Sequence, residues 1–116
     1  DGAAIVNIGS VSSFIGGRRS THYACSKAGL VALTQNMALF GAKQGIRVNM
    51  VAAGYVRSSM ADKGMEAEIV RKTVEGIPLG RLGEPSEIAD AVLWLASDKS
   101  SYVTAQVIHV NGGLYF

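Results

Sequence analysis

The stretch IRVNMVAA, residues 46–53, decides the fold of this chain. It is a short apolar run rich in β-branched residues, which is typical of a buried strand in a parallel sheet. A second run of this kind, AAIVNIG, occupies residues 3–9. Between them, residues 21–43 contain no proline and repeat apolar residues at helical spacing, and Gly45 suits the position just past a helix end. The sequence therefore predicts a βαβ unit with two parallel strands.

The part downstream of this unit predicts a long connection, a helix and a strand. Residues 54–83 read as the connection, with a helical piece around residues 65–75. Connections longer than ~15 residues in compact domains are usually lids or binding loops. Residues 83–98, GEPSEIADAVLWLASD, predict a helix, since Pro85 suits a first turn and the early glutamates complement its positive end. AQVIHV at residues 105–110 predicts the last strand, so the expected fold class is α/β with a parallel sheet.

The composition is that of a folded globular chain. The 116 residues are 48% hydrophobic with a net charge of +2, which points to neither a nucleic-acid nor a membrane partner. No apolar stretch approaches the ~20 residues that span a bilayer, and the start does not resemble a signal peptide, so we expect a cytoplasmic protein. The single cysteine, Cys25, is expected to be small, buried and inert. His22 and His109 have no partner cluster, and no metal site is predicted.

A tyrosine and a lysine lie four positions apart in the first predicted helix. Positions i and i+4 share a helix face, so Tyr23 and Lys27 present a phenol and an ammonium to one space. A nearby cation stabilises a phenolate and makes proton transfer by tyrosine easier. Ser10 lies just past the end of the first predicted strand, where parallel strands open into a ligand crevice. A hydroxyl there could donate to a carbonyl that becomes an alkoxide.

The tyrosine and lysine alone also permit a structural interpretation. Many helices contain this spacing by chance, with the tyrosine packed against the core and the lysine extended along the surface. Residues 18 and 19, both arginine, could meet an acidic part of a substrate or simply be solvated. Met60 and Met65 could contact an apolar substrate.

Several stretches together resemble the short-chain dehydrogenase/reductase family. VNIGS at residues 6–10 resembles the strand that ends in the family's catalytic serine, and YACSK at residues 23–27 matches its Tyr-x-x-x-Lys signature. GIRVNMVAAG at residues 45–54 is similar to the strand that leads to the nicotinamide-contacting loop. Residues 77–98 and 103–113 resemble the family's last helix and last strand. The resemblance covers all 116 residues and implies the C-terminal half of a Rossmann-like, doubly wound sheet.

The resemblance also implies roles for individual residues. Tyr23 would exchange a proton with the substrate oxygen, and Lys27 would stabilise its phenolate form and hold the nicotinamide ribose. Ser10 would position and polarise the carbonyl. The implied reaction interconverts a carbonyl and a secondary alcohol with NADP or NAD, as in 3-oxoacyl-acyl-carrier-protein reductases of fatty acid metabolism.

The loop after the second strand would contact the nicotinamide end of the cofactor. The resemblance places Gly54, Val56 and Ser58 there, with Val56 offering backbone groups to the carboxamide. The family usually has Pro-Gly where this chain has Ala53-Gly54, and threonine where it has Ser58. Alanine does not fix φ as proline does, so we expect a less preorganised loop with its chemistry intact.

Other elements that the family uses have no counterpart in residues 1–116. These are the glycine-rich pyrophosphate loop, the catalytic asparagine and the residue that selects NAD or NADP. We therefore interpret the chain as the catalytic and substrate-binding part of one domain, without its dinucleotide-binding half, and expect the isolated segment to be inactive. The resemblance further implies a homodimer or homotetramer and a small carbonyl or alcohol substrate, which an acyl carrier protein could carry.

Two alternatives stay open. One is a sugar dehydrogenase, or another secondary-alcohol dehydrogenase of the same family, because the connection at residues 54–83 fixes no substrate. The other is a non-catalytic nucleotide-sensing or scaffold member, or an inactive truncated product, because one fold hosts many functions.

Overall fold

A parallel sheet of three strands forms the centre of the molecule. The computed structural model describes residues 2–17, 20–58 and 67–116. The sheet has the order β1-β2-β3, formed by β1 (Ala3–Ser10), β2 (Ile46–Ala53) and β3 (Val107–Val110). The α/β class and the βαβ unit are confirmed. The expectations for Arg18, Arg19, Met60 and Met65 concern residues outside the described part.

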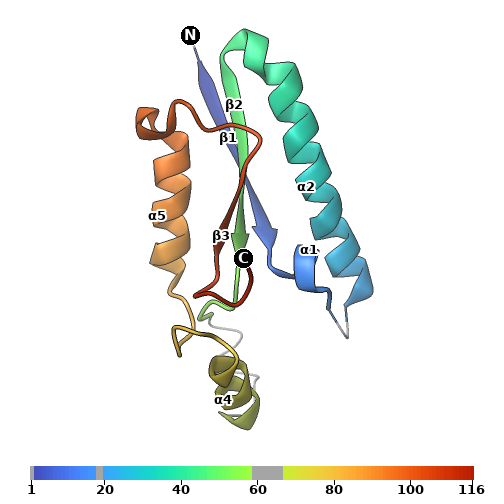
Figure 1. The fold of residues 1–116 in the computed structure, drawn as a ribbon, viewed down its shortest axis with the longest axis vertical. Helices are drawn as coiled ribbons and strands as arrows, with labels where there is room; N and C mark the ends of the chain where they lie inside the picture. The colour runs from blue at the N-terminus through green and yellow to red at the C-terminus, as the bar shows by residue number, and fades with distance from the viewer. Residues whose placement is uncertain (1, 18–19, 59–66) are drawn as a thin grey trace.

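Two long helices lie on opposite sides of the sheet (Figure 1). The first, α2 (Thr21–Gly41), connects β1 to β2 and packs against both. It continues as the short η1 (Ala42–Gln44) and ends at Gly45, which has a φ of 72°. The second, α5 (Pro85–Ala96), packs against all three strands, and η2 (Asp98–Ser100) follows it. A one-turn helix, α1 (Ser12–Ile15), lies after β1, and α4 (Ala67–Glu75) lies in the long connection.

The core lies along β2, because this strand is covered on both faces and paired on both edges. Val48, Met50, Val51 and Ala52 are each at most 1% exposed, and Leu95 of α5, the helix that packs on this strand, is fully buried. Hydrophobic burial of this kind stabilises the fold by roughly 25 cal/mol per Å² of apolar surface. The three strands are parallel, so the βαβ unit and α5 hold the carboxyl ends of β1, β2 and β3 at the same end of the sheet.

Hydrogen bonds from polar side chains connect β1 to α2, and β2 to the segment before β3. Asn7 of β1 donates to the hydroxyl of the buried Thr34 of α2 at 2.9 Å. The buried Asn49 donates to Val103 O at 2.9 Å and accepts from the Gln106 N–H at 3.0 Å. Buried polar groups are almost always hydrogen-bonded, so these contacts fix α2 against β1 and the segment before β3 against β2.

Three expectations from the sequence were wrong in part. The segment after β1, expected to be a loop, includes α1. The first strand was expected to be buried on both faces, but Ile8 is 47% exposed, since β1 lies at the edge of the described sheet. The last strand begins at Val107 instead of residue 105, because Ala105 has a φ of 60°, outside the extended region.

Cys25 is a further correction, because it is exposed. It precedes the buried Thr34 by nine positions on α2. At 3.6 residues per turn, this separation turns a helix by two and a half turns, so the two side chains lie on opposite sides. The side of α2 that carries Thr34 faces the sheet, and the side that carries Cys25 does not.

Candidate active site

The candidate site lies where the carboxyl ends of the strands meet. Ser10, Ala53 and Val110 occupy one row across β1, β2 and β3. The segments that leave this row are α1, the loop of residues 54–58 and the C-terminal residues 111–116. Ligands of open parallel sheets bind in the crevice outside these strand ends, so this row of residues forms the bottom of the candidate site.

Tyr23 and Lys27 lie together on the first two turns of α2. The Nζ atom of Lys27 is 5.7 Å from the centroid of the Tyr23 ring. The same ammonium donates a hydrogen bond of 3.1 Å to the backbone oxygen of Ile8. The Tyr23 side chain is accessible, because the residue is 42% exposed. The structure thus places a phenol, a cation and the end of β1 next to one another.

Ser10 occupies the end of β1, two residues after the carbonyl that Lys27 contacts. Its Oγ accepts a hydrogen bond of 3.1 Å from the N–H of Ser12, the first residue of α1. This bond uses a lone pair and leaves the hydroxyl proton available for donation to another group. Within the described residues, no hydrogen bond joins Ser10 to Tyr23. Lys27 contacts the backbone of Ile8, and Ser10 follows Ile8 by two residues. Ser10 and Tyr23 would be connected only through a substrate oxygen that both side chains bind.

The loop after β2 is held on two sides. The Gly54 N–H donates to Val110 O at 2.8 Å, which fixes the start of the loop against β3. Val56 forms a parallel bridge with Gly83, in which Gly83 N–H donates to Tyr55 O and Arg57 N–H donates to Gly83 O. Backbone groups of successive extended residues point to opposite sides, so the N–H and C=O of Val56 itself point away from Gly83.

These backbone groups fit the role that the sequence indicates for Val56. No described residue forms a hydrogen bond with the N–H or C=O of Val56. A donor and an acceptor side by side match a nicotinamide carboxamide, whose oxygen accepts and whose NH2 group donates. Ser58 is exposed at the end of the described part of the loop. The residues present therefore fit the nicotinamide end of NAD or NADP.

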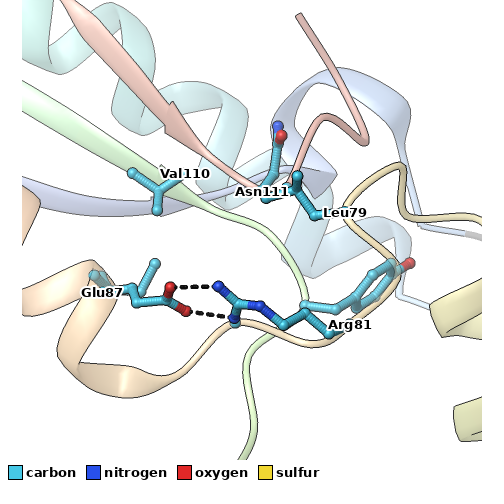
Figure 2. Close-up of a pocket in the computed structure, with 9 residues that line it drawn as sticks. Leu79, Arg81, Glu87, Val110 and Asn111 are labelled. Carbon is cyan, nitrogen blue, oxygen red and sulfur yellow. Dashed lines mark hydrogen bonds and ion pairs between the residues drawn. The ribbon is translucent and has the colours of Figure 1, made fainter.

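A small pocket lies beside this loop (Figure 2). It has a volume of about 110 Å³ and lies between Tyr55, the segment around Leu79 and the turn at Asn111. Ser10, Tyr23 and Lys27 are not among its lining residues. Sites for drug-sized ligands usually measure ~300 Å³ or more, so this pocket is too small for a dinucleotide and differs from the candidate active site.

An ion pair forms one wall of this pocket. The Arg81 guanidinium donates to both carboxylate oxygens of Glu87, at 2.8 and 2.7 Å, and Figure 2 shows the two groups facing each other. Glu87 also accepts from the Glu84 N–H at the start of α5, at 2.8 Å. The Arg81 hydrogen bonds, with that N–H, lower the pKa of Glu87 to about 2, and the same contact raises the pKa of Arg81. This pair ties the end of the long connection to α5.

Sequence reasoning did not single out several residues near the site. Arg81 lies in the glycine-containing stretch IPLGRLG at residues 77–83, which has no periodicity, and nothing in its spacing from Glu87 predicts an ion pair. Phe14 and Tyr115 contact each other across a separation of about a hundred residues, which no local pattern reveals. Among the residues that the structure describes, no group of three or more His, Cys, Asp or Glu side chains could hold a metal ion.

Comparison with known proteins identifies the family. A family model described as enoyl-(acyl carrier protein) reductase matches residues 1–115. A solved structure of a protein titled short-chain dehydrogenase/reductase SDR, glucose/ribitol dehydrogenase, from Brucella melitensis aligns with a TM-score of 0.90 at 34% identity. The chain belongs to the short-chain dehydrogenase/reductase family. The alignment covers 97% of this chain and 45% of the Brucella protein.

Curated members of the family show the same partial coverage. The 3-oxoacyl-acyl-carrier-protein reductase of Vibrio harveyi is 42% identical over 111 residues, which are 96% of this chain and 45% of that protein. The enzyme of the same name from Rickettsia felis is 44% identical over 110 residues, 95% of this chain and 45% of the relative. That of Staphylococcus aureus strain Mu50 is 43% identical over 112 residues, with coverage of 97% and 45%. The chain thus spans about half the length of these relatives.

No described helix is both long enough and apolar enough to cross a membrane.

Proposed function

We propose that these residues form the catalytic part of an oxidoreductase that interconverts a carbonyl and a secondary alcohol with NADPH or NADH. The observation that carries the proposal is the position of Lys27. Its ammonium lies beside the Tyr23 ring and bonds the carbonyl of Ile8, two residues before Ser10. A Tyr-x-x-x-Lys pair that occurs by chance on a helix surface is not expected to contact a strand close to a serine at its carboxyl end.

The proposed division of labour follows from the chemistry of each side chain. In the reducing direction, Tyr23 gives its phenolic proton to the substrate oxygen as that oxygen gains negative charge. Lys27 stabilises the phenolate that remains. The Ser10 hydroxyl donates a hydrogen bond to the same oxygen and holds the carbonyl in place. In the oxidising direction the proton returns from the alcohol to Tyr23.

NAD or NADP, when bound, supplies or accepts the hydride. We propose that Val56 holds the carboxamide with its backbone N–H and C=O, and that Lys27 contacts the ribose hydroxyls. Gly54 and Ser58 belong to the same loop, and their contacts stay predictions. The part of a Rossmann-type domain that binds the rest of the dinucleotide is expected outside these residues.

For the substrate, we propose a 3-oxoacyl thioester, with an acyl carrier protein as its carrier. Support comes from relatives that are 42–44% identical over nearly the whole chain and carry the name 3-oxoacyl-acyl-carrier-protein reductase. A sugar or other secondary alcohol is the second candidate, because the Brucella protein with a similar structure is titled glucose/ribitol dehydrogenase. Both candidates use the same three catalytic residues.

The test follows the absorbance of the reduced nicotinamide in the complete gene product that contains these residues. NADPH and NADH are each offered with a 3-oxoacyl thioester and then with simple ketones. Sugars and secondary alcohols are offered with the oxidised cofactors. We expect cofactor oxidation with the 3-oxoacyl thioester, and a loss of at least ~10²-fold in Tyr23→Phe, which keeps the ring and removes the proton.

The control is Tyr102→Phe, since Tyr102 is fully exposed and lies outside the site. Turnover of sugars alone would replace the 3-oxoacyl substrate with the second candidate. A folded protein that binds NADPH or NADH but reduces nothing would support a nucleotide-sensing or scaffold role. Normal activity in Tyr23→Phe would remove Tyr23 from the mechanism.

We also propose a homodimer or homotetramer. Leu33, Leu39 and Phe40 of α2 are 51%, 73% and 78% exposed. Exposed apolar side chains grouped on one helix often mark a contact with another chain or domain. Light scattering on the complete gene product tests this proposal, and a monomer at micromolar concentration would contradict it.

A further inference from the structure

The C-terminal residues 111–115 contact three segments that surround the candidate site. They follow β3 and turn at Asn111, where the Asn111 Oδ1 accepts from the Gly113 N–H at 3.0 Å. The Asn111 Nδ2 donates to the Tyr115 backbone oxygen at 2.9 Å. One side chain thus closes the turn at both ends, and Tyr115 is held at a defined place.

The first contact is with the start of the loop that follows β2. Gly54 lies so close to Asn111 that a Cβ at position 54 would be 2.6 Å from the Asn111 Cβ and 2.7 Å from its Cα. Contacts this short do not occur, so only glycine fits. The Gly54 N–H also bonds Val110 O, the residue before the turn. The turn therefore sets where the proposed cofactor loop leaves the sheet.

The second contact is with α1, which follows Ser10. The Tyr115 ring stacks on the Phe14 ring at a centroid distance of 5.2 Å, and both rings contact His109, at 5.1 and 4.7 Å. The His109 Nδ1 is buried and has no hydrogen-bond partner in the described part of the chain. Ring packing and not this nitrogen therefore holds the cluster together.

The third contact is with the segment that returns from α4. The Leu79 N–H donates to Gly112 O at 3.0 Å. Gly112 has a φ of 65°, and a Cβ there would lie 2.8 Å from Ile77 Cγ2. Residues 77–79 thus lie directly on the turn, so the turn contacts both the loop after β2 and the segment that precedes α5.

We propose that residues 111–115 are a positioning element for the active site, with Tyr115 and Asn111 as its key residues. The inference rests on the proposed function. Tyr115 holds Phe14 and so fixes α1, whose first N–H bonds the Ser10 hydroxyl. Asn111 keeps the turn against Gly54 and Leu79. Neither side chain needs to touch the substrate, and both set the geometry of groups that do.

The test compares Tyr115→Leu with two matched variants in the complete gene product. Tyr115→Phe keeps the ring and should behave as the unmodified protein. Phe116→Leu removes a neighbouring ring that is fully exposed and is the control for a change at this end of the chain. Asn111→Ala is the second test variant, because it removes both hydrogen bonds that close the turn.

Two readouts separate positioning from general stability. Amide hydrogen exchange should accelerate about tenfold at Ile15 and Gly16 of the α1 turn in Tyr115→Leu, and at Gly54 and Leu79 in Asn111→Ala, with the amides of β2 unchanged. Misplaced catalytic groups lower the rate more than binding, so kcat should fall about tenfold while the KM for substrate changes less than twofold.

Each outcome decides the proposal. Faster exchange throughout the chain, in proportion to lost stability, would show a purely structural role and overturn it. Faster local exchange with unchanged kcat would also overturn it. If the unmodified protein neither reduces a carbonyl nor oxidises an alcohol, the proposed function fails, and the exchange data alone then show whether residues 111–115 order α1 and Gly54.

Discussion

The Lys27 ammonium links α2 to β1, because its Nζ lies 3.1 Å from the backbone oxygen of Ile8. The same Nζ is 5.7 Å from the Tyr23 ring centroid. A lysine side chain on a helix surface usually extends into water and is free to move. Here a strand carbonyl accepts a hydrogen bond from it, which keeps the cation beside the phenol.

This link predicts the effect of removing the cation. Lys27→Met keeps the length of the side chain but loses the hydrogen bond to Ile8 and the charge next to Tyr23. We expect a fall of at least ~10-fold in kcat and weaker cofactor binding, since one group serves both. Steady-state kinetics and titration of cofactor fluorescence measure the two effects. Lys43→Met, at an exposed site in η1, should change neither, and a Lys27→Met enzyme of normal rate and affinity would exclude the lysine from the mechanism.

Ser10→Ala gives a second prediction. The substitution removes the hydroxyl that would donate to the substrate oxygen but leaves the strand intact. Loss of one donor to a developing oxyanion costs ~10²–10³ in kcat. The matched control is Ser12→Ala, because the Ser12 backbone N–H that bonds Ser10 remains. Equal kinetics in the two variants would show that the Ser10 hydroxyl does not act on the substrate.

The regular elements could be predicted because local patterns suffice for them. The bounds of β2 agree with the apolar run at residues 46–53, which glycines flank on both sides. The α2 helix begins at the predicted Thr21 and ends, through η1, at the predicted Gly45. The positions of Tyr23 and Lys27 on one face follow from helix geometry alone, so the pair could be found without coordinates.

The remaining features depend on contacts between distant parts of the chain. The four residues of α1 carry no helical pattern, and Phe14 is held there by rings from β3 and the C-terminus. The exposure of Cys25 could not be predicted, since α2 carries apolar residues on several sides and only tertiary packing decides which side is covered. Arg47, the second residue of the run at residues 46–53, could not be matched to its partners from the sequence.

Arg47 gives a prediction about stability. Its guanidinium donates to the backbone oxygens of Leu95, Ser97 and Val103 and to the Ser100 hydroxyl, at 3.0 to 3.2 Å. These bonds cap the end of α5 from β2. Arg47→Lys keeps the charge but not the planar fork, so we expect a loss of ~2 kcal/mol in the free energy of unfolding.

Urea denaturation of the complete gene product measures this loss. Arg71→Lys is the control, because the Arg71–Glu75 pair is exposed on α4 and such pairs contribute at most ~1 kcal/mol. An Arg47→Lys protein that is no less stable than Arg71→Lys would mean that other contacts cap α5.

The Arg81–Glu87 pair predicts a dependence of stability on pH. The pKa of Glu87 is lowered from 4.5 to about 2 in the folded chain. Between these values the unfolded chain binds the proton and the folded chain does not, so stability falls as the pH falls. The contribution of the pair is complete above pH 4.5 and disappears as the pH approaches 2.

Glu87→Gln should therefore lower Tm near pH 7, and its difference from the unmodified protein should shrink steadily below pH 4.5. Glu75→Gln on α4 is the control for loss of an exposed carboxylate. A Tm difference for Glu87→Gln that stays constant from pH 7 to pH 2 would show that the hydrogen bonds of this side chain, and not its charge, hold the long connection to α5.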